Sequence, residues 1–265
     1  MCAPAVRYAA PGVMRMDHAD FDQFLFVHDR KAKPVLYRGT GPGVIICHEL
    51  SGTSPTCLRL ARRIADAGFT SFVPVLFGKP GQSSMARGAL RVCLSREFTL
   101  LATGKRSPIS AWIAALAKDV ARRTKHSRVV AVGMCVTGGI VLPVLLSDDV
   151  SAVVASQPSL PFAPAFIPLA RRGDLGMSDD DLNEVRDTAK PVLGLRFQSD
   201  WMCPRQRLDR LEAELPAAEV HTVPSDNRND HSVLTLGYEQ NLPGTADAYS
   251  HVIAFLRTHL SGEPG

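Results

Sequence analysis

One cysteine in this chain stands where a nucleophile could work. The segment Gly133–Gly139 reads Gly-Met-Cys-Val-Thr-Gly-Gly and joins a run typical of a buried strand to a run typical of a helix. A side chain at such a sharp turn projects out of the sheet. Small neighbouring residues let other segments of the polypeptide pass close to the strained backbone. The amino end of the following helix favours a thiolate at Cys135, and the amide of Val136 can receive an oxyanion. The alternative is that Cys135 is a buried, inert thiol, as many cysteines are.

A thiol nucleophile needs a base, and the base needs an acid that orients it. Asp200 follows a predicted strand at 191–196, and His231 follows the last predicted strand at 220–223. Both are expected at the carboxyl ends of parallel strands, where open α/β sheets place their sites. The order nucleophile, acid, histidine is that of the α/β-hydrolases. We interpret the other seven histidines as surface or structural groups.

Three alternatives concern the acid that would orient His231. Asp200 could instead cap a helix predicted from Pro204 to about Leu215. Asp226 and Asp230 are rival acids, but they lie too close in sequence to His231 for the usual geometry. Asp200 therefore remains the predicted partner of His231.

The elements that must position these groups alternate along the chain. Short apolar runs alternate with helical patterns, which predicts a mostly parallel sheet with helices on both faces. A helix is expected between its cap Ser54 and the terminating Gly68. We expect one domain over residues 1–265. Strands are predicted at 23–28, 34–38, 43–47, 70–74, 128–133, 152–155, 191–196 and 220–223. Further helices are predicted at 109–120, about 138–147, 204–215 and from 245, with a short one near 90–101.

Composition excludes several classes of protein. The 265 residues are 45% hydrophobic, which is enough for a large core, and the net charge of +4 comes from scattered pairs of basic residues. A nucleic-acid partner is therefore not expected. None of the six cysteines forms a Cys-x-x-Cys pair, so we expect no metal site and free thiols in a reducing compartment, the cytoplasm. No apolar stretch approaches about 18 residues and no signal peptide is apparent, so no membrane association is expected.

Several motifs together resemble the dienelactone hydrolase family, from about residue 40 to 256. They are Val44–Gly52 (Val-Ile-Ile-Cys-His-Glu-Leu-Ser-Gly), Val73–Gly78, the cysteine turn, Asp200 with Pro204 four residues on, and His231-Ser232. The resemblance implies an α/β-hydrolase fold with little or no lid and a Cys-His-Asp triad that needs no cofactor. It also implies that Glu49 lies near the nucleophile and that the amide of Leu50 is a second oxyanion donor.

For Glu49, the resemblance implies a switch. A carboxylate beside Cys135 would hold the resting thiol protonated, because a nearby anion disfavours a thiolate. Substrate binding would then move Glu49 aside. The alternative is that Glu49 belongs to a structural ion pair.

The sequence departs from the family pattern at two places. Thr137 stands where the family often has glycine, and no arginine follows His231, although members that act on dienelactone hold the substrate carboxylate with arginines. Arg96 is a candidate for the other arginine, or it is an exposed residue paired with Glu97 or Glu49. Met134, Phe77 and Trp201 are candidate pocket residues, or core. The resemblance thus supports the hydrolase class more firmly than the dienelactone substrate.

We therefore expect transfer of an acyl group from a lactone or small carboxylic ester to water, by a monomer or homodimer. Three alternatives remain. A thiol lyase or amidotransferase-like protein would react with electrophiles without turning over esters. A binding protein would keep the fold with an inactive site. A redox-sensing thiol would react with peroxide and show no esterase activity.

Overall fold

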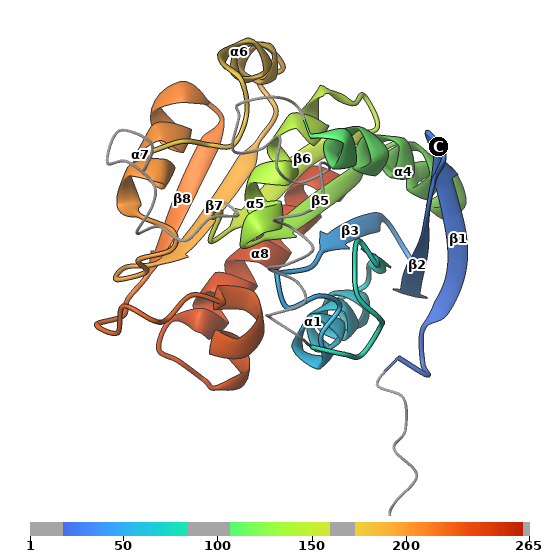
Figure 1. Cartoon of the computed structure of the whole chain (residues 1–265), viewed down its shortest axis with the longest axis horizontal. Helices are drawn as coiled ribbons and strands as arrows, with labels where there is room; N and C mark the ends of the chain where they lie inside the picture. The colour runs from blue at the N-terminus through green and yellow to red at the C-terminus, as the bar shows by residue number, and fades with distance from the viewer. Residues whose placement is uncertain (1–17, 84–106, 160–172, 262–265) are drawn as a thin grey trace, which may run out of the picture.

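The strands form one twisted sheet that crosses the molecule (Figure 1). The computed structural model describes residues 18–83, 107–159 and 173–261. The order of the strands in the described part is β1-β2-β4-β3-β5-β6-β7-β8. The pairs β1/β2 and β2/β4 are antiparallel and all others are parallel, which confirms the predicted mostly parallel sheet. The strands are β1 (Asp22–His28), β2 (Lys31–Gly39), β3 (Gly43–Cys47), β4 (Thr70–Pro74), β5 (Val129–Met134), β6 (Val150–Ser156), β7 (Val192–Phe197) and β8 (Ala218–Val223).

The central strands are apolar on both faces because helices cover both faces. Every residue of β3, β4, β5 and β7 is buried. This explains why their sequences are continuous runs of valine, isoleucine and similar residues rather than alternating patterns. The parallel strands therefore end together at one edge, where the polar loops begin.

Two groups of helices bury separate cores against the sheet (Figure 1). On one face lie α1 (Pro55–Asp66) and α8 (Thr245–Leu260). On the other lie α4 (Pro108–Thr124), α5 (Val136–Ile140), α6 (Asp179–Asp187) and α7 (Arg205–Glu214). The predicted cap of α1 is confirmed, since the Ser54 hydroxyl accepts a hydrogen bond from the Cys57 amide at 3.2 Å.

The first two strands form a tight hairpin around the predicted turn. Asp29 and Arg30 both have positive φ, 46° and 59°, as a two-residue turn with left-handed central residues requires. β1 reaches the turn at His28 as predicted, and because His28 pairs with Lys31, β2 begins three residues before the strand predicted at 34–38.

Two helices differ from the prediction. The helix expected at about 138–147 is in fact α5, which begins directly after Cys135, followed by a 3₁₀ helix, η2 (Leu142–Leu146). Pro143 has no amide hydrogen, so it suits a new first turn and not a helix interior. The helix α6 was not predicted; it begins after Ser178, whose side chain accepts a hydrogen bond from the Asp181 amide at 3.1 Å. The helix expected at 90–101 lies outside the described residues.

The described helices include none with both the length and the apolar character needed to cross a membrane. That residues 1–265 form one domain stays a prediction.

Candidate active site

Cys135 occupies a strained turn at the end of β5. Its backbone has φ 57° and ψ −124°, and α5 begins at the next residue. A non-glycine residue in this region costs about 1–3 kcal/mol, which the surrounding packing must offset. The packing leaves no room nearby: a Cβ on Gly133 would lie 2.3 Å from the Thr137 carbonyl oxygen, and one on Gly138 would lie 2.8 Å from the Cα of Pro158. The glycines around the thiol are therefore required by close approach of the chain.

Thr137, the departure from the family pattern, joins this turn to the end of β3. Its hydroxyl oxygen accepts a hydrogen bond from the Met134 amide at 2.8 Å. The same hydroxyl lies 2.9 Å from the Cys47 carbonyl oxygen, to which it can donate. Thr137 is fully buried, so these partners replace water. Thr137 thus links the cysteine turn to the loop that carries Glu49 and Leu50.

Asp200 and His231 are brought together as predicted from their positions after β7 and β8. The Nδ1 atom of His231 lies 2.7 Å from Oδ2 of Asp200, and both side chains are buried. The other oxygen, Oδ1, accepts hydrogen bonds from the amides of Met202 and Cys203 at 2.9 and 3.1 Å. Asp200 therefore contacts the imidazole with one oxygen and fixes the loop before α7 with the other.

The imidazole and the thiol shift one another's pKa. Nε2 of His231 is buried and has no well-formed hydrogen bond to any atom in the described ranges. Cys135 is nevertheless near enough to raise the pKa of the imidazole. Burial lowers the pKa of His231, but the charge of Cys135 and the hydrogen bond that Nδ1 donates to Asp200 outweigh it and raise the pKa to about 10. Burial raises the pKa of Cys135, but the adjacent His231 outweighs it and lowers the pKa. Both directions favour a thiolate beside an imidazolium.

Ser159 is a site residue that the sequence analysis did not single out. Its hydroxyl oxygen lies 3.1 Å from the Cys135 sulfur, and its amide donates to the Cys135 carbonyl oxygen at 3.0 Å. A hydroxyl that donates to the sulfur stabilises the thiolate and helps to lower the pKa of Cys135. The available signal was the run Ser-Gln-Pro-Ser at 156–159, which begins at the last residue of the buried strand β6.

Glu49 lies between neutral side chains. Its Oε1 accepts hydrogen bonds from Nε2 of Gln157 at 2.9 Å and from the hydroxyl of Thr235 at 3.0 Å. The alternative for Glu49 was an ion pair with an arginine or lysine. Among the described residues its partners are these two neutral side chains. The carboxylate raises the pKa of Cys135, but less than His231 lowers it.

His48 fixes the peptide that carries the Leu50 amide. Its Nδ1 lies 2.8 Å from the Glu49 carbonyl oxygen, and its Nε2 accepts from the Leu76 amide at 3.2 Å, so Nδ1 carries the hydrogen and donates. The Gly52 amide donates to the same carbonyl at 3.0 Å. In a trans peptide the carbonyl and the next amide point in opposite directions. Holding the Glu49 carbonyl therefore sets the direction of the Leu50 N–H.

His48 should make the fold sensitive to acid. Burial lowers its pKa from about 6.5 to about 4. As pH falls through this interval the unfolded chain binds a proton that the folded chain does not, so stability decreases. The decrease by pH 4.5 is expected to be about 2 kcal/mol. His48→Gln, which offers an amide donor and acceptor without titrating, should lose this component in urea unfolding at pH 7 and 4.5. An equal pH dependence in both proteins would contradict the assignment.

The candidate pocket residues fall in different places. Met134 is fully buried in the core beneath α1 and α8, so it is a core residue and not a pocket residue. It has no exposed surface with which to contact a substrate. Trp201 is half-buried, and the guanidinium of Arg228 lies 5.5 Å from its ring centre. The rings of Phe77 and His48 pack edge to face, with their centres 4.5 Å apart. Arg96 lies outside the described residues.

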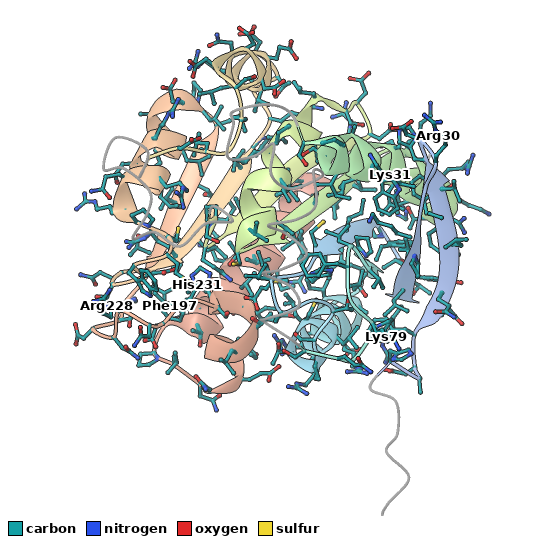
Figure 2. All side chains as sticks on the ribbon, in the orientation of Figure 1. Arg30, Lys31, Lys79, Phe197, Arg228 and His231 are labelled. Carbon is teal, nitrogen blue, oxygen red and sulfur yellow. The ribbon has the colours of Figure 1, made fainter. Side chains whose placement is uncertain are left out.

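A cavity of about 600 Å³ lies beside the site and not over it. It is lined by Lys33, Ser51, Gly52 and Lys79 among others, but by no member of the Cys135, Asp200 and His231 group. In Figure 2 the labelled His231 lies in the left half of the view and the labelled Lys79 at the lower right. The described residues include no cluster of three or more histidine, cysteine or acidic side chains that could hold a metal ion.

Comparisons with solved structures show the fold. A protein named as a "putative dienelactone hydrolase" from Klebsiella pneumoniae subsp. pneumoniae has a TM-score of 0.64 at 16% identity, with 90% of this chain and 98% of that chain covered. Est1E from Butyrivibrio proteoclasticus has a TM-score of 0.59 at 14% identity, covering 91% and 99%. A dienelactone hydrolase-like promiscuous phosphotriesterase, P91, from metagenomic libraries has a TM-score of 0.58 at 16% identity, covering 91% and 98%.

These neighbours share the α/β-hydrolase fold, which confirms the predicted fold class. No curated protein matches the sequence. The model of the dienelactone hydrolase family matches residues 30–260, which is most of the chain and includes Cys135, Asp200 and His231. The chain therefore belongs to the dienelactone hydrolase family.

Proposed function

We propose that this hydrolase cleaves lactones or small carboxylic esters with Cys135 as nucleophile, His231 as acid and base, and Asp200 as the group that orients His231. The observation that carries the proposal is the buried contact of 2.7 Å between His231 and Asp200 beside a cysteine at a strained strand-to-helix turn. The family match supports the hydrolase class.

In the first step, the Cys135 sulfur attacks the carbonyl carbon and an S–C bond forms. The amides of Val136 and Leu50 are the proposed oxyanion donors, each worth about 3 kcal/mol by analogy with measured cases. The tetrahedral intermediate then breaks its bond to the alkoxide oxygen, and the imidazolium of His231 gives that oxygen its proton. An acyl-enzyme remains; for a lactone, the leaving hydroxyl stays attached to the acyl chain.

In the second step, neutral His231 takes a proton from water as the water oxygen attacks the thioester carbonyl. Cys135 leaves as a thiolate, the carboxylic acid is released, and the thiolate–imidazolium pair is restored. Asp200 holds the ring orientation through Nδ1 and stabilises its charged form throughout. The cytoplasmic location and the monomer or homodimer state stay predictions from the sequence.

A substrate panel tests the proposal. Lactones, aryl esters and thioesters of small acids are assayed with the wild-type protein and with Cys135→Ser. We expect the wild type to turn over at least one class and to give a burst of one alcohol per active site where deacylation is slow. A wild-type protein that is alkylated at Cys135 but hydrolyses none of them would contradict the proposal and favour a non-hydrolytic thiol protein.

A further inference from the structure

The strand β1 lies at one edge of the sheet, and its outer side is open in the described part of the chain. Its inner side pairs with β2 from Asp22 to His28, and no other strand of the described ranges pairs with it (Figure 1). Edge strands are usually protected by a lysine, a proline or a bulge, because an open edge can pair with another chain. Between Asp22 and His28, β1 reads Gln-Phe-Leu-Phe-Val and has none of these protections.

The two most exposed large hydrophobic side chains of the described residues lie on this strand. Leu25 is 63% exposed and Val27 is 58% exposed. Successive residues of a strand point to opposite faces, so these two side chains share one face. Phe24 and Phe26 point to the other face and pack against the core beneath α4. Folding of one chain thus accounts for the two phenylalanines and leaves Leu25 and Val27 in water.

The hairpin turn determines which backbone groups of β1 point to the open side. In a two-residue hairpin the residues that flank the loop, here His28 and Lys31, exchange both hydrogen bonds. Such hydrogen-bonded pairs then alternate along the two strands. The amides and carbonyls of Gln23, Leu25 and Val27 therefore point away from β2.

The backbone of β2 confirms this alternation. Pro34 lies opposite Leu25, and its carbonyl oxygen accepts a hydrogen bond from the Val75 amide at 2.9 Å, on the side of β2 away from β1. A residue of β2 that bonds away from β1 faces a residue of β1 that also bonds away from β2. The open side of β1 thus presents backbone donors and acceptors together with exposed apolar side chains.

A second copy of β1 matches this side in the antiparallel direction. When Leu25 lies opposite its own copy, the full length of the strand overlaps, and Gln23 exchanges backbone hydrogen bonds with Val27 of the second copy. The same register places the exposed acid Asp22 opposite the exposed His28 of the second copy. A parallel arrangement would instead bring the two Asp22 carboxylates together.

We propose that two copies of this chain associate through β1, antiparallel about a two-fold axis at Leu25, so that the two sheets join into one. The same surface is used on both subunits, as is usual for two-fold dimers. A single pair of strands is a small interface, so the dimer is expected to dissociate on dilution. The interface lies at the opposite edge of the sheet from β8, which precedes His231; in Figure 2 the labelled Arg30, at the end of β1, is at the upper right.

Sedimentation velocity over about 1–200 µM protein tests the proposal. The wild-type mass should rise with concentration from the 28.7 kDa of one chain toward twice that value. Hydrogen exchange of the peptide Asp22–His28 should slow over the same range, because the outward amides become bonded. Leu25→Lys places two like charges face to face at the axis and should raise Kd about 100-fold or more.

Leu236→Lys is the matched control. Leu236 is the third exposed large hydrophobic residue, at 49%, but it lies in a π-helical turn, η5 (Val233–Gly237), far from β1 in the order of the sheet. The same substitution there should leave the dimer as strong as in the wild type. A general effect of added charge on solubility would move both variants, and an effect of the β1 surface moves only Leu25→Lys.

Two further variants test the backbone pairing and the register. Gln23→Pro removes an outward amide hydrogen but no hydrogen bond to β2, and should raise Kd about tenfold or more. His28→Glu places a carboxylate opposite Asp22 of the second copy and should weaken the dimer. Adding Asp22→Lys to His28→Glu makes the pair opposite in charge again and should restore it.

The proposal is overturned if the wild type is monomeric over the whole range, or if Leu25→Lys and Gln23→Pro dimerise as well as the wild type. It is also overturned if the double variant is no stronger than His28→Glu, because Asp22 and His28 would then not be opposite. A monomer in which the β1 peptide exchanges slowly would mean that the edge is covered within one chain, which equally refutes pairing with a second copy. None of these measurements uses an ester, so they leave the proposed function untouched.

Discussion

Cys135→Ala is expected to lower kcat for the best ester substrate by about 10⁴-fold or more, with the protein still folded. The reason is that the variant removes the atom that forms the acyl-enzyme while leaving the proposed oxyanion donors in place. His231→Ala should cause a loss of similar size, since the two groups act as a unit. The measurement is steady-state hydrolysis of an activated aryl ester, corrected for the rate in buffer.

Cys57→Ala is the matched control for this experiment. Cys57 is also a buried free cysteine, but it lies in α1, beneath the opposite face of the sheet. Its substitution should leave kcat within a few-fold of the wild type. Wild-type activity in Cys135→Ala would rule out the assigned nucleophile.

Asp200→Asn is expected to lower kcat by about 10²- to 10⁴-fold while the fold is kept. With its oxygen kept for the two backbone amides, the carboxamide presents its NH₂ group to Nδ1 of His231, so the ring takes the wrong tautomer and loses the charge that stabilises its imidazolium form. The remaining oxygen can still accept from the amides of Met202 and Cys203, as Oδ1 does in the wild type. Asp200→Asn should therefore lower kcat while it leaves the free energy of unfolding almost unchanged.

Asp200→Ala is the comparison that tests this separation. It removes the acceptor of both amides, and a buried group left unsatisfied, as that of Cys203 would be, costs about 1–3 kcal/mol. The unfolding free energy in urea should therefore fall in Asp200→Ala and change little in Asp200→Asn, although both lose activity. Equal stability of the two variants would contradict the second role of Asp200.

Much of the sheet could be predicted because its central strands are buried on both faces. A run such as Gly-Val-Ile-Ile-Cys at 43–47 has no other favourable position in a folded chain of this kind. Residues at element ends were less predictable, since hairpin pairing with β1 extended β2 back to the turn. The helix α6 was missed because its segment is short and acidic, although Ser178 followed by three aspartates is a usable start signal.

For the site, chain order was enough to bring Cys135, Asp200 and His231 to one edge, because parallel strands end on the same side. The surroundings of Glu49 could not be inferred in the same way. Its partner Gln157 is 108 residues away and Thr235 is 186 residues away, and neither belongs to a recognisable motif. Such pairings depend on the register between neighbouring strands and on the path of a π-helical turn, neither of which has a local sequence signal.

The wide spacing of these contacts has a consequence for how the molecule acquires its chemistry. The hydroxyl of Thr137 bonds across 90 residues to Cys47, and the imidazole of His231 meets a carboxylate 31 residues earlier. No fragment released early from a ribosome could contain the whole arrangement, and closing long loops is the slow, entropically costly stage of folding. A chain that has not yet been synthesised as far as residue 231 lacks the base, so the sulfur of Cys135 can become activated only after the segment beyond β8 has joined the sheet.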